Sequence, residues 1–224
     1  MGVFDGYAKR MLRPGKGDHD PVPQKGSKRV FYIFVTHFWK IVTLNLVFVL
    51  FSIPVVTIPA AICGMVKVLY TLFTEGTVDV YKDFIAEFRI SFKKSIIPGL
   101  IGLVGLGGGG FALDFYLQVG GTFGTIGLVF TAAIMIWVWV FLNHLFYQIA
   151  VVDLPLGTLM KNARILSVGQ VKQNFLLILV SGVILFLMVF FLPLSAIPSL
   201  FIVLAFCQLC SCAILFDSVM LCIK

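Results

Sequence analysis

The stretch LNLVFVLFSIPVVTIPAAICGMVKVLYTLFTEGTVDVYKDFIAEFRISFKK (residues 44–94) decides the fold class of this chain. Its first part is almost uncharged and is divided by Pro54 and Pro59, while its last part carries charges of both signs. Proline disfavours helix at the residue before it and suits the first turn of a following helix. The stretch therefore predicts an apolar helix, a proline-marked turn, a second shorter helix and a charged amphipathic helix.

The composition of the whole chain indicates the environment of these helices. Of the 224 residues, 60% are hydrophobic and only 12% are charged, and the mean hydropathy is +1.06. Soluble domains are about 45–50% apolar and about 25% charged, so a soluble core could not bury this excess. Several nearly uncharged runs reach the roughly 18 residues needed to cross a bilayer core. We therefore predict an all-α, polytopic membrane helix bundle in the plasma membrane.

Six transmembrane helices are predicted, with two cytoplasmic amphipathic helices and both termini in the cytoplasm. The spans are expected at 41–58, 59–75, 95–117, 123–152, 175–192 and 200–223, the amphipathic helices at 78–94 and 155–174, and uncharged outer turns at 54–59, 118–122 and 193–198. Segment 59–75 is only about 25 Å long at 1.5 Å per residue. It is counted as a span because crossing there places the basic segment after it on the inner side.

The basic residues at the start of the chain predict a cytoplasmic tail at residues 1–29, followed by one transmembrane domain at 30–224. Seven of the seventeen lysines and arginines lie in this tail, which lacks the apolar region of a cleavable signal peptide. Because the tail flanks a span, membrane lipid is the expected partner and nucleic acid is not. A parallel repeat of 59–117 and 125–193 is also proposed, since each contains a helix, an amphipathic helix and a helix.

No catalytic, cofactor-binding or metal-binding residues are predicted, and the chain is expected not to be an enzyme. His19, His37 and His144 are isolated in the sequence, and no H-E-x-x-H or G-x-S-x-G motif occurs. Gly105, Gly107 and Gly110 formally match G-x-G-x-x-G, but no strand precedes them. These glycines instead predict close helix contact, a kink or local unwinding of the third span.

The residues of interest are therefore predicted to make contacts rather than to perform chemistry. The candidates for packing or partner binding are Asn45, Pro54, Thr57, Pro59, Phe84, Phe88, Phe92, Lys93, Lys94, Gly105 and Gly109, and the intramembrane polar candidates are Lys67, Asp114, Asn143 and His144. Polar groups inside spans are costly and normally face protein or a water-filled cavity. For Asn143 and His144, interhelical hydrogen bonds are the favoured interpretation, and a polar gate is the alternative.

Two segments, LNLVFVLFSIPVVTIPAA (44–61) and YKDFIAEFRISFKKS (81–95), resemble the YesL family of bacterial membrane proteins. The chain keeps the Asn-Leu start of the span, the Pro-Val-Val-Thr-Ile turn, the Asp-Phe pair and the Phe-Lys-Lys element of that family. It departs from the pattern at Ile58, which runs directly into Pro59 where the family usually has a glycine between them, and at Ser95, where asparagine is usual.

The resemblance implies a role rather than a reaction, because the family has no established activity. Its members are often encoded beside carbohydrate-uptake ABC transporters in Gram-positive bacteria. The leading hypothesis is therefore a non-enzymatic accessory protein that binds the permease subunits of an ABC-type oligosaccharide importer. The chain has no Walker motif with which to energise transport itself. The alternative is an independent small-solute transporter or channel, in which the intramembrane polar candidates would line a path.

Overall fold

A computed structural model of the chain describes residues 27–191 and 199–223, and the regular elements in this part are all helical, as predicted. They are α2 (Ser27–Thr36), α3 (Phe38–Phe51), the 3-10 turn η1 (Val55–Thr57), α4 (Ile58–Glu75), α5 (Val80–Gly102), the π-helical turn η2 (Leu103–Gly107), α6 (Gly108–Val119), α7 (Gly121–Val151), α8 (Leu156–Gly169), α9 (Val171–Phe190), the π-helical turn η3 (Ser199–Val203) and α11 (Leu204–Ile223). Most of the predicted tail and the predicted outer turn at 193–198 lie outside the described residues.

Four helical stretches are long and apolar enough to cross a membrane. They are Val55–Glu75, Val80–Val119, Gly121–Val151 and Val171–Phe190. A fifth is added if Lys28–Thr36 and Phe38–Phe51, which are bent by 85° relative to each other, form one broken span. Phe201–Phe216 is a shorter apolar helix. The chain is thus a polytopic membrane protein with four or five candidate spans among its described residues, and the six-span topology and the orientation of the termini stay predictions.

The boundaries of the first predicted span, 41–58, differ from those of the structure. Helix α3 ends at Phe51, and a turn that includes η1 occupies the residues up to α4. Pro54 is extended, with φ −78° and ψ 118°, because a proline fixes its own φ and disfavours helix in the residue before it. Pro59 lies in the first turn of α4. N–H groups in a first turn have no partner within the helix, so a proline there costs no hydrogen bond.

One helix runs from Val80 to Val119 and joins two elements that were predicted separately, the amphipathic helix at 78–94 and the span at 95–117. Its 40 residues correspond to about 60 Å at 1.5 Å per residue, which is twice the thickness of a bilayer core. No glycine separates the two predicted elements, and Pro98 lies within α5 without ending it. The predicted amphipathic helix is therefore the first half of a longer helix and not a separate surface element.

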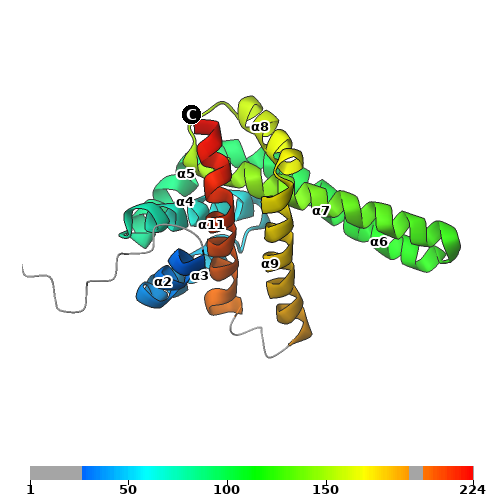
Figure 1. Cartoon of the computed structure of the whole chain (residues 1–224), viewed down its shortest axis with the longest axis horizontal. Coiled ribbons are helices and arrows are strands. Elements are labelled where there is room, and N and C mark those ends of the chain that lie inside the picture. The colour runs from blue at the N-terminus through cyan, green and yellow to red at the C-terminus, as the bar shows by residue number, and fades with distance from the viewer. Residues whose placement is uncertain (1–26, 192–198, 224) are drawn as a thin grey trace, which may run out of the picture.

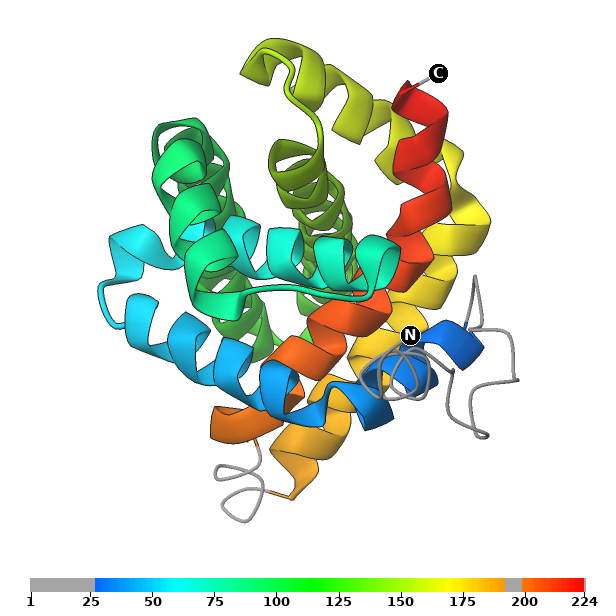
Figure 2. The ribbon, with the colours of Figure 1, turned by 90° about the vertical axis from the view of Figure 1, so that its left-hand side faces the viewer.

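Helices α6 and α7 form an antiparallel arm that projects from the rest of the molecule (Figure 1). The turn between them is made by Gly120 and Gly121, with φ of 62° and 61°, a region that only glycine adopts without strain. In Figure 1 the arm lies at a large angle to α9 and α11 and points away from them. Figure 2, turned by 90°, shows the molecule approximately along the axis of the arm. The arm is therefore not parallel to α9 and α11, the last two helices of the chain.

Glycines hold the two helices of the arm close together. A Cβ atom on Gly105 would lie 2.9 Å from Cγ1 of Val138, and a Cβ atom on Gly109 would lie 2.5 Å from Cγ of Met135. Only hydrogen fits in these positions, so each glycine accepts a large side chain of α7 against its backbone. The predicted helix contacts of Gly105 and Gly109 are thus made with Val138 and Met135 of α7, respectively.

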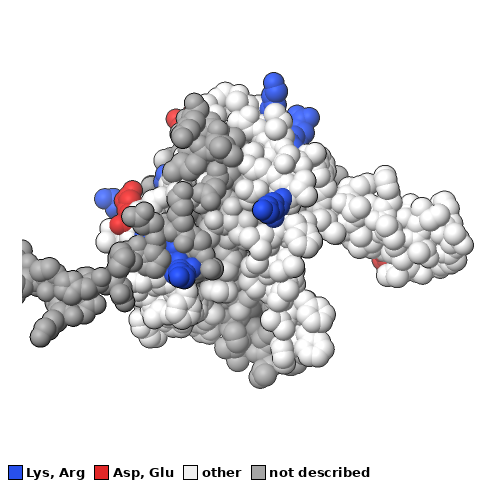
Figure 3. All heavy atoms as spheres, viewed as in Figure 1, with Lys and Arg blue, Asp and Glu red and all other residues white. Residues whose placement is uncertain are grey.

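The outer faces of the arm are apolar and uncovered. Large side chains that are more than half exposed occur along it, among them Phe111, Phe115, Phe123 and Phe130. Asp114 is the one Asp, Glu, Lys or Arg between residues 102 and 151, and Figure 3 shows the arm almost free of charge. In a bilayer such a surface contacts lipid or another membrane protein.

The core of the body is centred on α4. Half of the most apolar 18-residue stretch in Val55–Glu75, which contains this helix, is buried, compared with 6% of the corresponding stretch in Val80–Val119. Its closest neighbour is α5, and two glycines allow their contact: Gly64 lies against Phe84, and Gly99 lies against Pro59. The short second span of the sequence is therefore the central helix of the structure.

Arg29, the last residue of the predicted tail, lies inside α2 and is only 7% exposed. Its Nε and Nη2 atoms donate hydrogen bonds of 3.2 and 2.9 Å to the carbonyl oxygen of Phe73, in the last turn of α4. Its guanidinium group also lies 5.8 Å from the centre of the Phe73 ring. A cation at this end of a helix satisfies a free carbonyl and interacts favourably with the helix dipole.

We expect Arg29→Met to destabilise the purified protein by about 1.5–3 kcal/mol, the range for a hydrogen bond to a charged group. Methionine keeps the length and apolar packing of the side chain but removes the charge and both donors. Thermal unfolding in detergent measures the effect, and Lys28→Met, which changes an exposed neighbour, is the matched control. Equal shifts of the two variants would show that the Arg29 contact contributes no stability.

Candidate functional site at the base of the arm

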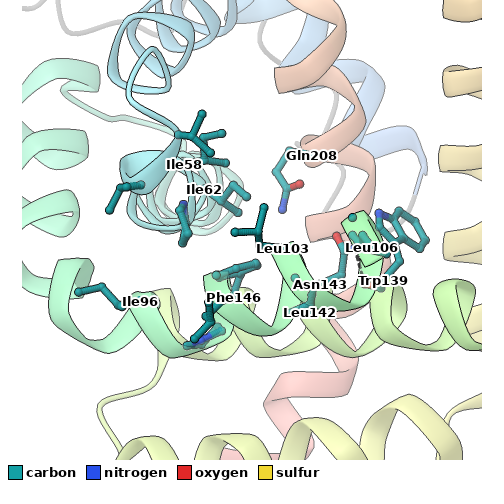
Figure 4. A pocket seen from close by; sticks show the side chains of 18 residues that line it. Ile58, Ile62, Ile96, Leu103, Leu106, Trp139, Leu142, Asn143, Phe146 and Gln208 are labelled. Carbon is teal, nitrogen blue, oxygen red and sulfur yellow. Dashed lines mark hydrogen bonds between the residues drawn. The ribbon is translucent and has the colours of Figure 1, made fainter. Parts of the chain in front are cut away.

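A groove of about 630 Å³ lies where the arm joins the body, and we call it the base groove. Its walls come from η1 and the start of α4, from the end of α5 with η2, from α7, and from one residue of α11 (Figure 4). The lining residues are Val55, Val56, Ile58, Pro59, Ile62, Ile96, Pro98, Gly99, Leu100, Gly102, Leu103, Leu106, Gly107, Trp139, Leu142, Asn143, Phe146 and Gln208. None of them is charged, so the base groove is an apolar site with a small polar component.

The polar component of the base groove consists of two amide side chains. Asn143 on α7 and Gln208 on α11 reach into the space from different helices (Figure 4). The Nδ2 atom of Asn143 donates a 2.9 Å hydrogen bond to the carbonyl oxygen of Trp139, one turn earlier in the same helix. Gln208 makes no hydrogen bond to any residue that the structure describes. The two amides can therefore bind a further hydrogen-bonding group.

The wall on the α4 side depends on the proline-marked turn. The hydroxyl group of Thr57 donates to the carbonyl oxygens of Phe51 and Pro54, at 2.5 and 2.6 Å, and its N–H donates to Pro54 at 2.9 Å. These bonds close the turn locally and leave Val55 and Val56 exposed at the rim of the groove. The turn residues selected from the sequence therefore shape one side of this site.

The opposite wall contains the π-helical turn η2, which interrupts the long helix at Leu103–Gly107. Single π-helical turns are rare and are often found at functional sites, because the inserted residue widens the helix and redirects its side chains. Here Leu103, Leu106 and Gly107 line the base groove. The local unwinding predicted for the glycine-rich segment takes the form of this turn.

A second group of polar residues lies between α4 and α5. Glu87 is 8% exposed, accepts a short hydrogen bond from the Ser91 hydroxyl, and interacts electrostatically with Lys67 and Lys94. Lys67, which the sequence places near the middle of a span, thus lies within electrostatic range of a carboxylate on the neighbouring helix, without an ion pair between them among the described residues. An opposite charge on a neighbouring helix partly offsets the cost of a lysine inside a membrane protein.

Lys94 on α5 forms an ion pair with Asp153, in the segment between α7 and α8. Its Nζ atom lies 2.9 Å from Oδ1 of Asp153, and this ion pair is largely exposed to solvent. The hydrogen bond and the charge of Lys94 lower the pKa of Asp153 below its usual value. The ion pair therefore persists at neutral pH and is lost only as the pH falls through that lowered pKa. Lys93 is exposed beside it.

His144 lies next to Asn143 in the sequence but faces a different part of the molecule. It is fully buried, and its Nε2 atom lies 2.7 Å from Oδ1 of Asn174 on α9. The Nδ2 atom of Asn174 in turn donates to the carbonyl oxygens of Leu166 and Ser167, at 3.1 and 2.7 Å. This network joins α7, α8 and α9, so His144 takes part in interhelical hydrogen bonding.

The other predicted residues do not lie in the base groove. Asn45 is buried in α3, and its Oδ1 atom accepts a 2.8 Å hydrogen bond from the N–H of Ala205 in α11. Asp114 is exposed on the arm, where it accepts a hydrogen bond from Gln118. The three phenylalanines Phe84, Phe88 and Phe92 form a row along α5, and the first two contact Phe51 of α3. Their row lies largely within the protein.

Several residues of these sites were not singled out from the sequence. Gln208 and Asn174 are uncharged residues in strongly apolar segments, and a search for isolated amides in spans would have found them. Periodicity alone places Glu87 on the polar face of an amphipathic helix, because it does not show that a second helix covers that face. The burial of Glu87 is a tertiary feature.

The described residues contain no group of three or more His, Cys, Asp or Glu side chains that could hold a metal ion. Cys63, Ser91 and Glu87 do lie close together, but Cys63 and Ser91 are at most 1% exposed, and Glu87 is also buried. The packing of α4 on α5 leaves a substrate no access to them. The arrangement is suited to linking the two helices.

Residues 41–115 match a family model described as "Protein of unknown function, DUF624". The matched region includes the proline-marked turn, α4, α5 and η2. It therefore contains both helices of the α4–α5 contact and two of the four walls of the base groove. No curated protein and no solved structure matches the chain. The chain is thus a polytopic membrane protein with a DUF624 region, whose activity must be inferred from its structure.

Proposed function

We propose that this chain is a non-enzymatic accessory protein that binds the membrane subunits of a transporter through its arm. The observation that carries this proposal is the arm itself, because α6 and α7 extend away from the body with an apolar, almost uncharged and uncovered surface. A helical hairpin that served only to complete the chain's own bundle would pack against the other spans along its length. This one is held together by its own glycines and is free to contact a neighbouring protein.

The direction of the arm also favours a partner at its side. If α9 and α11 cross the bilayer upright, the arm is strongly tilted within the apolar layer and reaches sideways beyond the body (Figure 1). Gly108 and Gly110 face open space on this arm, since a Cβ atom on either would meet nothing within 4 Å. Exposed glycines let the helix of a partner approach the backbone closely, which strengthens packing where hydrophobic driving force is absent.

The identity of the partner is proposed from the resemblance to the YesL family. That resemblance, carried by residues 44–61 and 81–95, favours the permease subunits of an ABC-type carbohydrate importer in a Gram-positive plasma membrane. Both of these segments lie within residues 41–115, the region that matches the DUF624 family model.

Purification from the native host in a mild detergent, followed by mass spectrometry, tests this function. We expect stoichiometric recovery of ABC permease subunits with the wild-type protein and at least a fivefold lower recovery with the double variant Gly108→Leu/Gly110→Leu. Gly182→Leu on α9 is the matched control, because Gly182 also faces open space but lies outside the arm. Recovery of the protein alone in several detergents and in nanodiscs would contradict the proposal.

An independent small-solute transporter is the second candidate, and the base groove favours it only for uncharged solutes of low polarity, because the lining carries no charge and only two amides. The intramembrane polar candidates do not line one path, because Asn143 faces the groove, His144 faces α9, Lys67 faces α5 and Asp114 lies on the arm. Flux of sugars or ions into liposomes containing only this protein would favour this candidate over the accessory role.

A further inference from the structure

We propose that the base groove binds one chain of an uncharged membrane amphiphile, whose hydroxyl or carbonyl group is held by Asn143 and Gln208. The chemistry is that of an acyl chain attached to an uncharged oxygen-containing head, as in an acylglycerol. This site is separate from the outer surface of the arm, so it does not depend on the proposed accessory function.

The size of the groove selects a ligand of this kind. Small-molecule sites commonly have volumes of about 300–1,000 Å³, and the base groove has about 630 Å³. The volume of the groove is therefore suited to a single small ligand or one flexible chain.

The lining of the groove selects against charged and strongly polar ligands. No Asp, Glu, Lys, Arg or His is among the lining residues, so a charged head group would lose its hydration without gaining a partner. A sugar would bring many hydroxyl groups to a site that offers only two amides. A hydrocarbon chain, in contrast, is compatible with the leucine, isoleucine, valine and aromatic side chains that form most of the walls.

The two amides give the ligand a polar end. Gln208 makes no hydrogen bond to a described residue, and an unbonded amide in an apolar layer is costly. One N–H of the Asn143 amide donates to the carbonyl oxygen of Trp139, which leaves its second N–H to donate and its Oδ1 atom to accept a hydrogen bond from a hydroxyl group. Gln208 can donate to a carbonyl oxygen or accept from a hydroxyl group. One uncharged oxygen function near the end of a chain would satisfy both side chains.

The groove opens where a bilayer lipid could enter. Val55, Val56, Leu100 and Leu103 line it and are each more than half exposed. They belong to stretches that are long and apolar enough to cross a membrane. This exposed apolar rim is suited to the entry of a hydrocarbon chain from surrounding lipid.

Photolabelling in nanodiscs tests the proposal. The probe is a monoacylglycerol with a diazirine on its acyl chain, and adducts are located by mass spectrometry of the irradiated protein. We expect adducts to concentrate at 103–107 and 139–143. Gly107→Leu should reduce them at least fivefold, because Gly107 lines the groove and a Cβ atom there has free space around it. Gly182→Leu on α9, where a Cβ atom also has free space around it but which lies outside the groove, should leave the labelling unchanged.

A second variant tests the polar end of the ligand without filling the groove. Gln208→Leu should weaken competition by unlabelled monoacylglycerol at least threefold, while labelling by a diazirine hydrocarbon without a head group stays unchanged. Thermal unfolding in the same nanodiscs confirms that each variant is folded. Adducts spread along α6 and α9 in proportion to exposure, or labelling unaffected by both Gly107→Leu and Gln208→Leu, would overturn the proposal. These results are independent of whether permease subunits are recovered with the protein.

Discussion

Gly99→Leu should lower the unfolding temperature of the purified protein more than any other glycine substitution in its described residues. A Cβ atom on Gly99 would lie 2.2 Å from Cγ of Pro59, the shortest such distance among the described glycines. The ring of Pro59 is rigid and lies in the first turn of α4, so it cannot rotate away as a flexible side chain could. Overpacking of this kind costs about 1–3 kcal/mol, and a displaced helix contact raises the cost toward the upper end.

Two other glycines provide the comparison for this prediction. Gly109 approaches Met135 nearly as closely, but methionine has three rotatable bonds and can move aside, so Gly109→Leu should destabilise less. Gly108→Ala, which meets nothing within 4 Å, should be neutral or slightly stabilising because alanine is the better helix former. Thermal unfolding in detergent measures all three. If Gly99→Leu and Gly108→Ala shifted the unfolding temperature alike, the close contact of α4 and α5 would be wrong.

Asn174→Leu is expected to have the second largest effect, because one buried amide joins three helices. The substitution removes the hydrogen bond to His144 and both bonds to the carbonyl oxygens at the end of α8. The imidazole of His144 is fully buried and has no other partner for its Nε2 atom among the described residues. A buried polar group left unsatisfied costs about 1–3 kcal/mol, although bonds between membrane helices average nearer 0.6 kcal/mol.

Unfolding of the variant in detergent, with a double-mutant cycle, separates these contributions. His144→Leu combined with Asn174→Leu leaves no unsatisfied imidazole, so the double variant should be more stable than the sum of the single effects implies. Gln173→Leu is the matched control, because it replaces the neighbouring amide, which makes no hydrogen bond to a described residue. Strict additivity of the two single variants would show that the His144–Asn174 bond carries no coupling energy.

The agreement between sequence and structure is best where a local rule acts. Pro54 and Pro59 end one helix and begin the next, because proline restricts its own backbone and that of its neighbour. The uncharged turn at 118–122 is the tip of the arm, where two adjacent glycines take positive φ. Between 94 and 98 hydropathy changes, but the helix continues and even accommodates Pro98, so the predicted boundary between surface helix and span was wrong.

The sequence by itself determined the class of this protein, since a chain so apolar can hide its surface only in a membrane, and helices are the elements that satisfy their own backbone there. It also placed most helices, because periodicity, proline and glycine act over a few residues. Only the tertiary structure decided which groups come together: His144 bonds to Asn174, Glu87 lies within electrostatic range of Lys67, and Asn143 and Gln208 line the same groove. The members of these pairs are separated by 20 to 65 residues in the chain, and their proximity depends on how the helices pack, which no local pattern specifies.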